Sequence, residues 1–203
     1  PTNGLPLIDA NFKVRGDRNP DFTLGWLNNI TIKDLRISFL WDVKIGGDIF
    51  NATERYLTTI GRSALTKDRA VPRVVPGVLR DGKENTTTPT LNNISITPET
   101  NSLFYTTMPE EAFIEKDVNW FRLRDLTFNY NIKKLLKGDI NNLAKTLNVF
   151  LTINDLILIS NYRGADPAVG ATTSASRGVS GFGFDYGNMG APVSFNFGFR
   201  ASF

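Results

Sequence analysis

The sequence contains neither cysteine nor histidine. Without cysteine, the chain can form no disulfide, thiolate metal site or cysteine nucleophile. Without histidine, it lacks the commonest general base and the commonest zinc ligand. A catalytic centre would have to use carboxylate, lysine, serine or tyrosine groups, and the chain shows no serine-centred motif. We therefore expect a protein that is not an enzyme and that holds no metal or cofactor.

Long hydrophobic runs are also missing, and the positive charge is dispersed. No apolar segment approaches the ~20 residues that a transmembrane helix requires. The net charge of +3 is spread along the chain, and its one short cluster, Lys133, Lys134 and Lys137, lies in a predicted turn. A solvated turn explains that cluster better than a nucleic-acid contact does. We therefore expect no nucleic-acid partner.

Two further patterns resemble ligand sites but lack their defining residues. The glycine-rich segment 178–190 is followed by no Lys-Ser/Thr pair, which a phosphate-binding loop requires. Asp17, Asp21 and Asp166 lack the dense oxygen-ligand spacing of a calcium loop. Side-chain turns next to proline account for these three residues, so neither pattern predicts a ligand site.

The chain is instead rich in phenylalanine, with 15 Phe against 2 Met, and its apolar residues alternate with polar ones. The apolar residues occupy even positions from Phe22 to Ile32 and odd positions from Leu35 to Ile45. A two-residue turn at Lys33-Asp34 would place 32 opposite 35 and 26 opposite 41, so both apolar sets would share one face. Each strand is close to the ~9–11 residues that cross a bilayer with tilt. This pattern predicts a membrane-spanning β-hairpin.

Three further segments alternate in the same way, with Phe150 as the one exception. Short turns separate some strands and long loops separate others, which is typical of outer-membrane barrels with the short turns in the periplasm. We predict an all-β fold, in which this chain provides about five C-terminal strands of a large antiparallel transmembrane β-barrel. The predicted strands lie near 22–32, 35–45, 118–132, 146–156 and 193–203, the extracellular loops at 1–21, 46–117 and 157–192, and the periplasmic turns at 33–34 and 133–145.

A soluble β-sandwich would also show alternation, but its strands are usually ~5–6 residues long and its connections are short. Five strands cannot close a barrel, because single-chain bacterial barrels have even strand numbers from ~8 upward. An open sheet in lipid would leave backbone groups unpaired. We therefore expect a fragment, or one chain of a split barrel, whose missing part is N-terminal. Within the first long loop, the spacing of Phe50, Tyr56, Leu57 and Ile60 predicts a short helix.

Five sequence motifs occur in an order and spacing that resemble a known family. They are GDRNPDF at 16–22, GGDIFNAT at 46–53, FIEKDVNWFRLRDLTFNY at 113–130, NDLILISNYRGADP at 154–167 and GFDYGNMGAPVSFNFGFRASF at 183–203. Together they resemble the C-terminal region of the SusC/RagA family of TonB-dependent outer-membrane transporters of the Bacteroidetes. The chain departs from the common family pattern at Ala168 and Val193, which bear on the detail of the second long loop.

The resemblance implies a 22-stranded barrel with an N-terminal plug, placed in the outer membrane of a Gram-negative bacterium. Such transporters import oligosaccharides or peptides with energy passed through TonB, and a SusD-like surface lipoprotein covers each barrel. The implied partners are therefore this lipoprotein, the N-terminal remainder of the barrel with its plug, TonB, the lipid bilayer and the barrel-assembly machinery. A structural or secretion-associated barrel without nutrient uptake remains the alternative.

Three groups of residues are candidates for function. Trp120, Arg122 and Arg124 are expected near the outer rim, where they could contact a carbohydrate or peptide, although structural pairing with neighbouring strands also explains them. The resemblance implies that the aromatic C-terminus is a signal recognised by the barrel-assembly machinery. Alternatively, it is simply the lipid-facing end of a strand, with an aromatic residue at the membrane interface. The residues of this expected signal are Phe195, Phe197, Phe199 and Phe203. Polar residues expected to line the barrel or pack on the plug are Arg36, Asp42, Asn148, Thr152 and Asn154.

Overall fold

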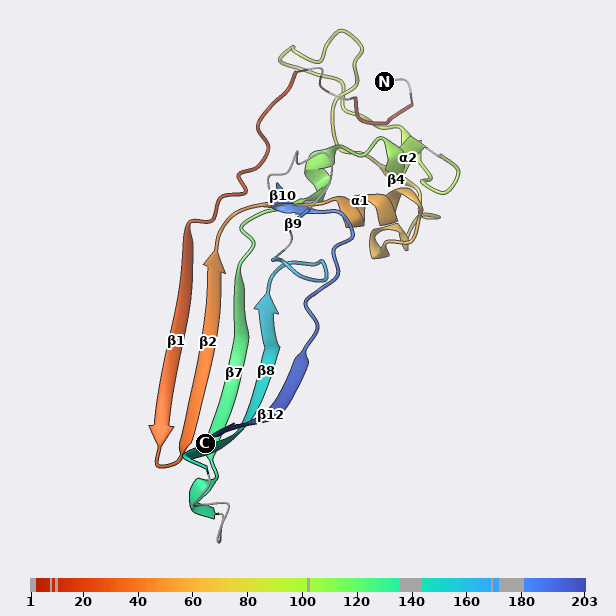
Figure 1. Cartoon of the computed structure of the whole chain (residues 1–203). Coiled ribbons are helices and arrows are strands. Elements are labelled where there is room, and N and C mark those ends of the chain that lie inside the picture. Colours follow the sequence, from red (N-terminus) through yellow and green to blue (C-terminus); the bar gives the residue numbers. More distant parts are fainter. Residues whose placement is uncertain are drawn as a thin grey trace.

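A five-stranded antiparallel sheet forms the main body of the computed structural model (Figure 1), with strand order β1-β2-β7-β8-β12. The structure describes residues 3–7, 9, 11–101, 103–135, 144–168, 170–171 and 181–203. The strands of the sheet are β1 (Phe22–Ile32), β2 (Leu35–Ile45), β7 (Trp120–Asn131), β8 (Thr146–Ser160) and β12 (Ser194–Ser202). The predicted all-β fold is therefore confirmed, and among the described residues β1 and β12 each pair with a single strand.

The first hairpin has the register that the alternation predicts. Ile32 pairs with Leu35 and Trp26 pairs with Trp41 across a turn at Lys33-Asp34. Lys33 adopts a left-handed conformation with φ of 56°, which suits the tight two-residue turns that connect antiparallel strands. Because partners across a sheet share a face, this register places the apolar side chains of both strands together.

One face of the sheet is apolar across all five strands, and the other is mainly polar. On the apolar face, Trp41 stacks on Phe121 with ring centroids 4.2 Å apart. On the polar face, the hydroxyls of Thr127 and Thr152 lie 2.9 Å apart. Most of the apolar face is covered by no other part of the described chain, and Phe197 on β12 is 76% exposed. A sheet with this division needs an apolar environment on one side only.

Irregularities in β7 and β8 correct two of the predicted boundaries. The register between these strands shifts between Leu123 and Asp125, and Asp155 adopts a left-handed conformation with φ of 51°. After this bulge the two strands pair again, as far as Trp120 with Ser160. β8 therefore ends at Ser160 rather than near 156, and β7 begins at Trp120 rather than near 118. The sequence did not reveal that the strand resumes, because Asp155 interrupts the odd apolar positions and the apolar Leu156 and Leu158 then obscure the alternation.

Phe150, the exception in the alternation, has a structural reason. It lies on the polar face of β8, directly opposite Gly198 of β12. A Cβ atom at Gly198 would lie 2.7 Å from Cζ of the Phe150 ring, so the ring occupies the space that a side chain would need. A glycine in one strand thus accommodates an aromatic ring in its neighbour.

We expect Gly198→Ala to lower the free energy of unfolding by about 1–3 kcal/mol, because the Phe150 ring must leave its position. Gly25→Ala is the matched control, since a Cβ there would have no atom within 4 Å. The control should raise stability by about 0.5–1 kcal/mol, because alanine in a strand loses less backbone freedom on folding than glycine. Urea unfolding of the protein in lipid vesicles measures both. Equal effects at the two positions would contradict this packing.

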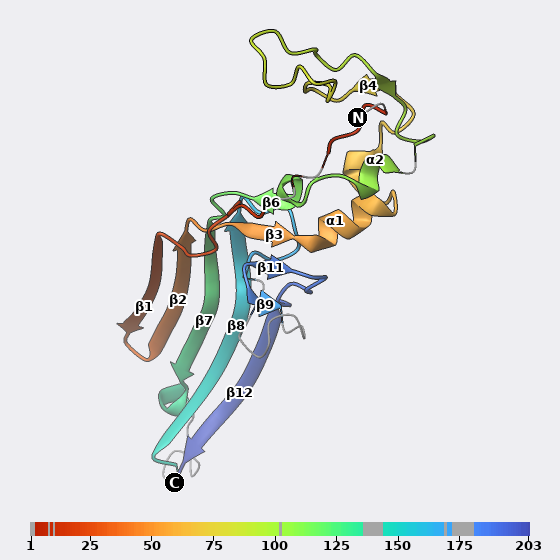
Figure 2. The same cartoon turned by 90° about the horizontal axis from the view of Figure 1, so that it is seen from above.

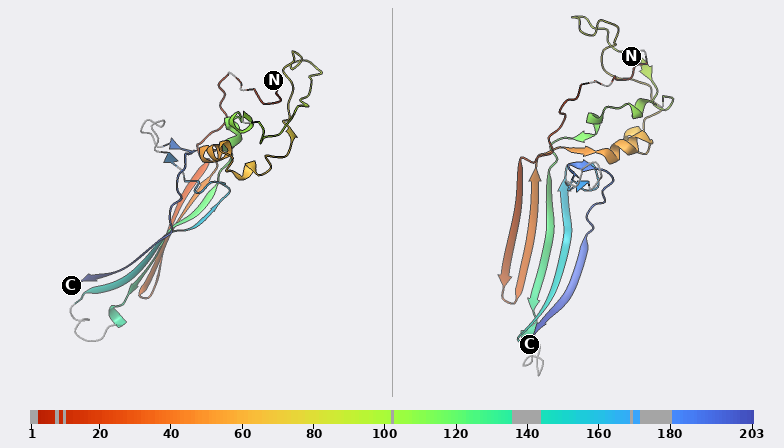
Figure 3. Two further views of the ribbon diagram at one scale, coloured as in Figure 1. Left: turned by 90° about the vertical axis from the view of Figure 1, so that its right-hand side faces the viewer. Right: turned by 45° about the horizontal axis from the view of Figure 1, so that its top comes forward.

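A loop layer lies at the end of the sheet opposite to the C-terminus (Figures 1 and 3). Its centre is a small sheet of β11 (Phe184–Asp185), β3 (Ile49–Asn51) and β6 (Ile114–Glu115), with β3 in the middle. Ile49, Val118 and Tyr162 form a buried apolar cluster there. Three segments that are distant in sequence therefore meet in one core above the long strands.

Helix α1 (Ala52–Thr59) follows β3 directly and confirms the predicted short helix. The Asn51 side chain accepts a hydrogen bond from the Glu54 N–H, which satisfies one of the free donors at the helix start. The other short helices are α2 (Leu103–Thr106) and the 3-10 helices Ala64–Thr66, Glu110–Phe113 and Lys133–Leu135.

The remaining strands are short pairs in the loops, and Figure 2 shows their places above and beside the main sheet. They are β4 (Arg73–Val74) with β5 (Ser95–Ile96), and β9 (Gly170–Ala171) with β10 (Gly181–Phe182). Part of the predicted turn 133–145, namely 136–143, lies outside the described residues. Within the described part of the chain, no helix has the length and apolar character needed to cross a membrane.

Candidate functional site

The candidate site is the polar face of the sheet together with the charged residues where that face meets the loop layer. The bulge in β7 shapes this region. Trp120 and Arg122 share a face with their partners Lys44 and Asp42 on β2. Arg124 is the extra residue of this bulge, and its side chain reaches Asp42, so both arginines lie on the polar face despite the register shift between them.

Arg122 anchors the long loop between β8 and β12, which contains Asp166, to the strands. Its side chain is 2% exposed and forms ion pairs with Asp155 at 3.2 Å and with Asp166. Asp166 also accepts hydrogen bonds from the N–H groups of Ala168 and Ala191, at 2.9 and 3.1 Å. The buried Arg122 guanidinium thus connects β7 to β8 through Asp155 and to both ends of the loop through Asp166.

Burial acts to raise the pKa of Asp166, but hydrogen bonds from the Ala168 N–H, Arg122 and the Ala191 N–H outweigh it and hold the pKa below its ordinary value. A carboxyl with a lowered folded-state pKa stabilises the fold above its unfolded-state pKa of about 3.9. That stabilisation is lost as the pH falls below this value towards the folded-state pKa.

We therefore expect the amide protons of Ala168 and Ala191 to lose protection as the pH falls below about 4, while the long strands stay protected. Hydrogen exchange followed by mass spectrometry, corrected for the intrinsic pH dependence of exchange, measures this. In an Asp166→Asn variant the loop should show no such pH-dependent step. An unchanged step in that variant would assign the transition to another group.

Arg124 lies beside this anchor but is more accessible, with a side chain 40% exposed. Its guanidinium contacts Asp42 at 2.7 Å and lies 4.0 Å from Asp155. The two carboxylates hold the planar cation in place while part of it remains open to solvent. Such an arrangement can present hydrogen-bond donors to a bound polar molecule.

Lys44 and Trp120 form the upper end of the polar face. Lys44 is 2% exposed, and its ammonium group lies over the rings of Trp120 and Phe182, at 4.8 and 5.1 Å from their centroids. Among the described residues, neither the Lys44 ammonium nor the Trp120 indole N–H has a hydrogen-bond partner. The two aromatic rings therefore contact this cation directly, and the Asp48 carboxylate is the charge that acts on it from nearby.

A second polar network joins the loops above the strands, and sequence reasoning missed it. Glu115 accepts a hydrogen bond from Asn51 at 2.9 Å and another from the Arg163 N–H at 2.9 Å. Tyr162 donates to Asp185 at 2.6 Å. Burial and this bond raise the pKa of Tyr162 above its ordinary value, so the phenol stays neutral and acts as a donor. The motifs contained these residues, but no local signal indicated which of them would meet.

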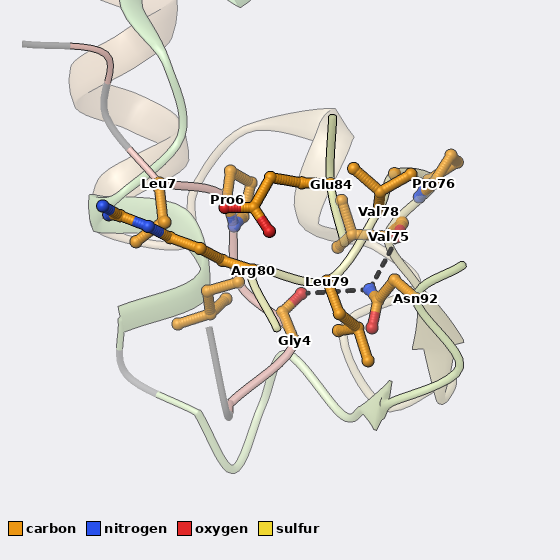
Figure 4. A pocket seen from close by; sticks show the side chains of 12 residues that line it. Gly4, Pro6, Leu7, Val75, Pro76, Val78, Leu79, Arg80, Glu84 and Asn92 are labelled. Atoms are coloured by element: carbon orange, nitrogen blue, oxygen red, sulfur yellow. Dashed lines mark hydrogen bonds between the residues drawn. The ribbon is translucent and has the colours of Figure 1, made fainter. Parts of the chain in front are cut away.

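A separate cavity of about 360 Å³ lies in the outer loops, between residues 4–7 and 75–92 (Figure 4). The Asn92 side chain donates to the carbonyls of Gly4 and Val75, at 3.4 and 2.8 Å, and so ties the two segments together. The wall is mainly apolar, with Arg80 and Glu84 as its charged residues. This cavity lies far along the loops from the polar face of the sheet.

The expected substrate residues thus have unequal surroundings. Trp120 and Arg122 are buried beneath the loops, as the structural-pairing interpretation requires, and Arg124 is the accessible member. The expected turns at Asp17 and Asp166 are present, since each carboxylate accepts the N–H two residues ahead. Among the described residues, no group of three or more acidic side chains could hold a metal ion.

The expected assembly signal lies on the open side of the sheet. Phe195, Phe197 and Phe199 share the apolar face of β12 and are 66–76% exposed, and Phe203 follows the strand with 70% exposure. Their common face and exposure fit contact with lipid. They are equally compatible with recognition of the strand by another protein.

One curated protein is similar to almost the whole chain. It is TonB-dependent receptor P3 of Formosa agariphila, which is 27% identical over 206 residues. The match covers 97% of this chain but 18% of the relative, so the chain spans less than a fifth of the relative's length. No family model matches the chain. This similarity supports a relationship of the chain to TonB-dependent receptors.

Proposed function

We propose that this chain forms part of the barrel wall of an outer-membrane importer of the TonB-dependent receptor type, in a Gram-negative bacterium. One observation carries the proposal: an exposed face that is apolar apart from Asn28 extends across five strands of membrane-spanning length. Water would make such a face unfavourable, whereas a bilayer would make it favourable. The opposite, polar face would line the interior.

The two outer edges of the sheet support the same proposal. β1 and β12 each lack a second partner among the described strands, and unpaired strand edges are costly in lipid. In a closed barrel, strands from the rest of a longer protein would pair with both edges. The similarity to a relative more than five times as long fits this arrangement.

Within the TonB-dependent importers, we propose that this protein is of the SusC/RagA type and takes up oligosaccharides or peptides. Its partners would be a SusD-like lipoprotein over the outer loops, a plug inside the barrel, TonB as energy source, and the barrel-assembly machinery. Within this chain, Arg124 would contact substrate, since its guanidinium is held in place yet open. Trp120 and Arg122 would position the surrounding strands and loops. The order and spacing of the five motifs support this assignment.

The test compares uptake by cells that carry the complete gene, a deletion, or the deletion with the gene restored. We expect labelled oligosaccharides or peptides to enter the periplasm only when the gene is present, and to stop entering when a protonophore collapses the energy source. Purification of the native protein should also recover a SusD-like lipoprotein. Uptake that is unchanged by the deletion would favour a structural or secretion-associated barrel subunit instead.

A further inference from the structure

The inner half of the polar face, close to the short β1–β2 turn, differs in charge from the outer half. In the outer half, Arg122 and Arg124 are paired with carboxylates. In the inner half, Arg36 and Arg200 form no ion pair within the described residues. Both arginines are exposed. The polar face therefore presents unpaired positive charge at this end.

Amide side chains, together with the ring of Phe150 opposite Asn129, lie between the two arginines. Arg36 pairs across the sheet with Asn129, while Asn148 pairs with both Asn131 and Arg200. Strands lie ~4.8 Å apart, so β2 and β12 are separated by about 14 Å, and the two arginines lie in neighbouring cross-strand rows of the polar face. Cations and amides of one face thus form a continuous band.

Hydrogen bonding within the band leaves its donors free. The side-chain oxygen of Asn131 accepts a hydrogen bond from the Lys133 N–H at 3.0 Å. This contact leaves the side-chain NH2 group of Asn131 available as a donor. The described residues show no hydrogen bond to the side chains of Arg36, Asn129 or Asn148. The band therefore has guanidinium and amide donors but few groups that accept from them.

A cavity of about 230 Å³ is present at this band, lined by Arg36, Asn129, Asn131, Asn148, Thr31 and Lys33. Asp34 also lines it, but its carboxylate is paired with Lys134 at 2.8 Å. A guanidinium matches a carboxylate with two parallel hydrogen bonds, and neutral amides can donate to the same oxygens. The chemistry of the wall is thus complementary to a singly charged carboxylate.

We propose that this cavity binds a carboxylate group, with Arg36 as the residue that contacts it and the three asparagines as further donors. The inference rests on the proposed function in one respect, because it takes the polar face to line the interior of a barrel. The carboxylate has two sources: an aspartate or glutamate elsewhere in the longer protein, or an acidic substrate that passes through the barrel.

The test is the structure of the complete receptor, determined by electron cryomicroscopy without ligand, with excess D-glucuronate, and with excess D-glucose. A carboxylate oxygen should lie within hydrogen-bonding distance of the Arg36 guanidinium. If the receptor supplies it, the contact is present in all three samples; if substrate supplies it, the contact appears with glucuronate alone. Water or neutral groups at Arg36 in every sample would overturn the proposal.

Two variants separate charge from shape. Arg36→Gln keeps a polar side chain but removes the cation, and the carboxylate should be lost from the site. Arg62→Gln is the matched control, because Arg62 is also exposed but lies in the outer loops, and the carboxylate should remain. The same maps distinguish the two proposals. A closed barrel without a carboxylate at Arg36 rejects this inference alone, and strands that form no barrel reject the proposed function.

Discussion

Replacing Arg122 with methionine should lower the free energy of unfolding by about 3–5 kcal/mol, which is the usual cost of removing one partner from a buried ion pair. The substitution leaves Asp166, which is itself largely buried, without its cation. It also removes the contact to Asp155 that connects β7 with β8. We expect the second long loop to detach from the strands before the sheet itself unfolds.

Arg124→Met is the matched control for this substitution. Arg124 lies on the same strand and also pairs with aspartate, but its side chain is 40% exposed, so its loss should cost about 0–1 kcal/mol. Urea unfolding in lipid vesicles gives the free energies, and hydrogen exchange at Ala168 and Ala191 reports on the loop. Adding Asp166→Asn to Arg122→Met should recover part of the loss, because the unpaired charge disappears. Equal losses for the two arginines would refute the anchoring role.

Phe197→Arg should make folding into a bilayer less favourable by about 2–4 kcal/mol, the cost of a lipid-facing arginine near the membrane midplane. Phe197 lies near the middle of β12 on the apolar face and is 76% exposed. A charged group there would have to leave water for hydrocarbon. The protein should therefore fold into vesicles less completely and unfold at a lower urea concentration.

The neighbouring Asn196 provides the control for Phe197, because successive side chains of a strand point to opposite faces. Asn196 pairs with Thr152 on the polar face. Asn196→Arg should therefore change stability by less than about 1 kcal/mol, since its cation would face a polar interior. If Asn196→Arg were the more damaging substitution, the two faces would have been assigned the wrong way round.

The main sheet could be predicted from the sequence because its signal is local and repetitive. A strand with one apolar face must alternate, and a two-residue turn fixes the register of the strands that it joins. The pairing of Trp26 with Trp41 followed from the two-residue turn at Lys33-Asp34 and the parity of the apolar positions. The same reasoning predicted helix α1, because the spacing of its apolar residues differs from that of a strand.

The loop layer and the candidate site could be predicted only in part, because their contacts join distant segments. Tyr162 and Asp185 are 23 residues apart, and Asn51 and Glu115 are 64 apart, so no local pattern indicates that they meet. The bulge at Arg124 and Asp155 hid the true end of β8, because Asp155 interrupts the apolar positions and Leu156 and Leu158 break the alternation beyond it. Sequence reasoning did place Arg122 at the outer rim, but burial and pairing with Asp166 became visible only in the fold.

The central claim is that the apolar face of this sheet contacts lipid, and single-cysteine labelling along β12 tests it most directly. The chain has no cysteine, so a thiol introduced at each position from 194 to 202 labels this strand at one site. A fluorophore on each thiol is read in vesicles whose lipids carry a quencher in the acyl chain. We predict strong quenching at 195, 197, 199 and 201 and weak quenching at 194, 196, 198, 200 and 202. Quenching without this alternation, or quenching absent throughout, would contradict the account.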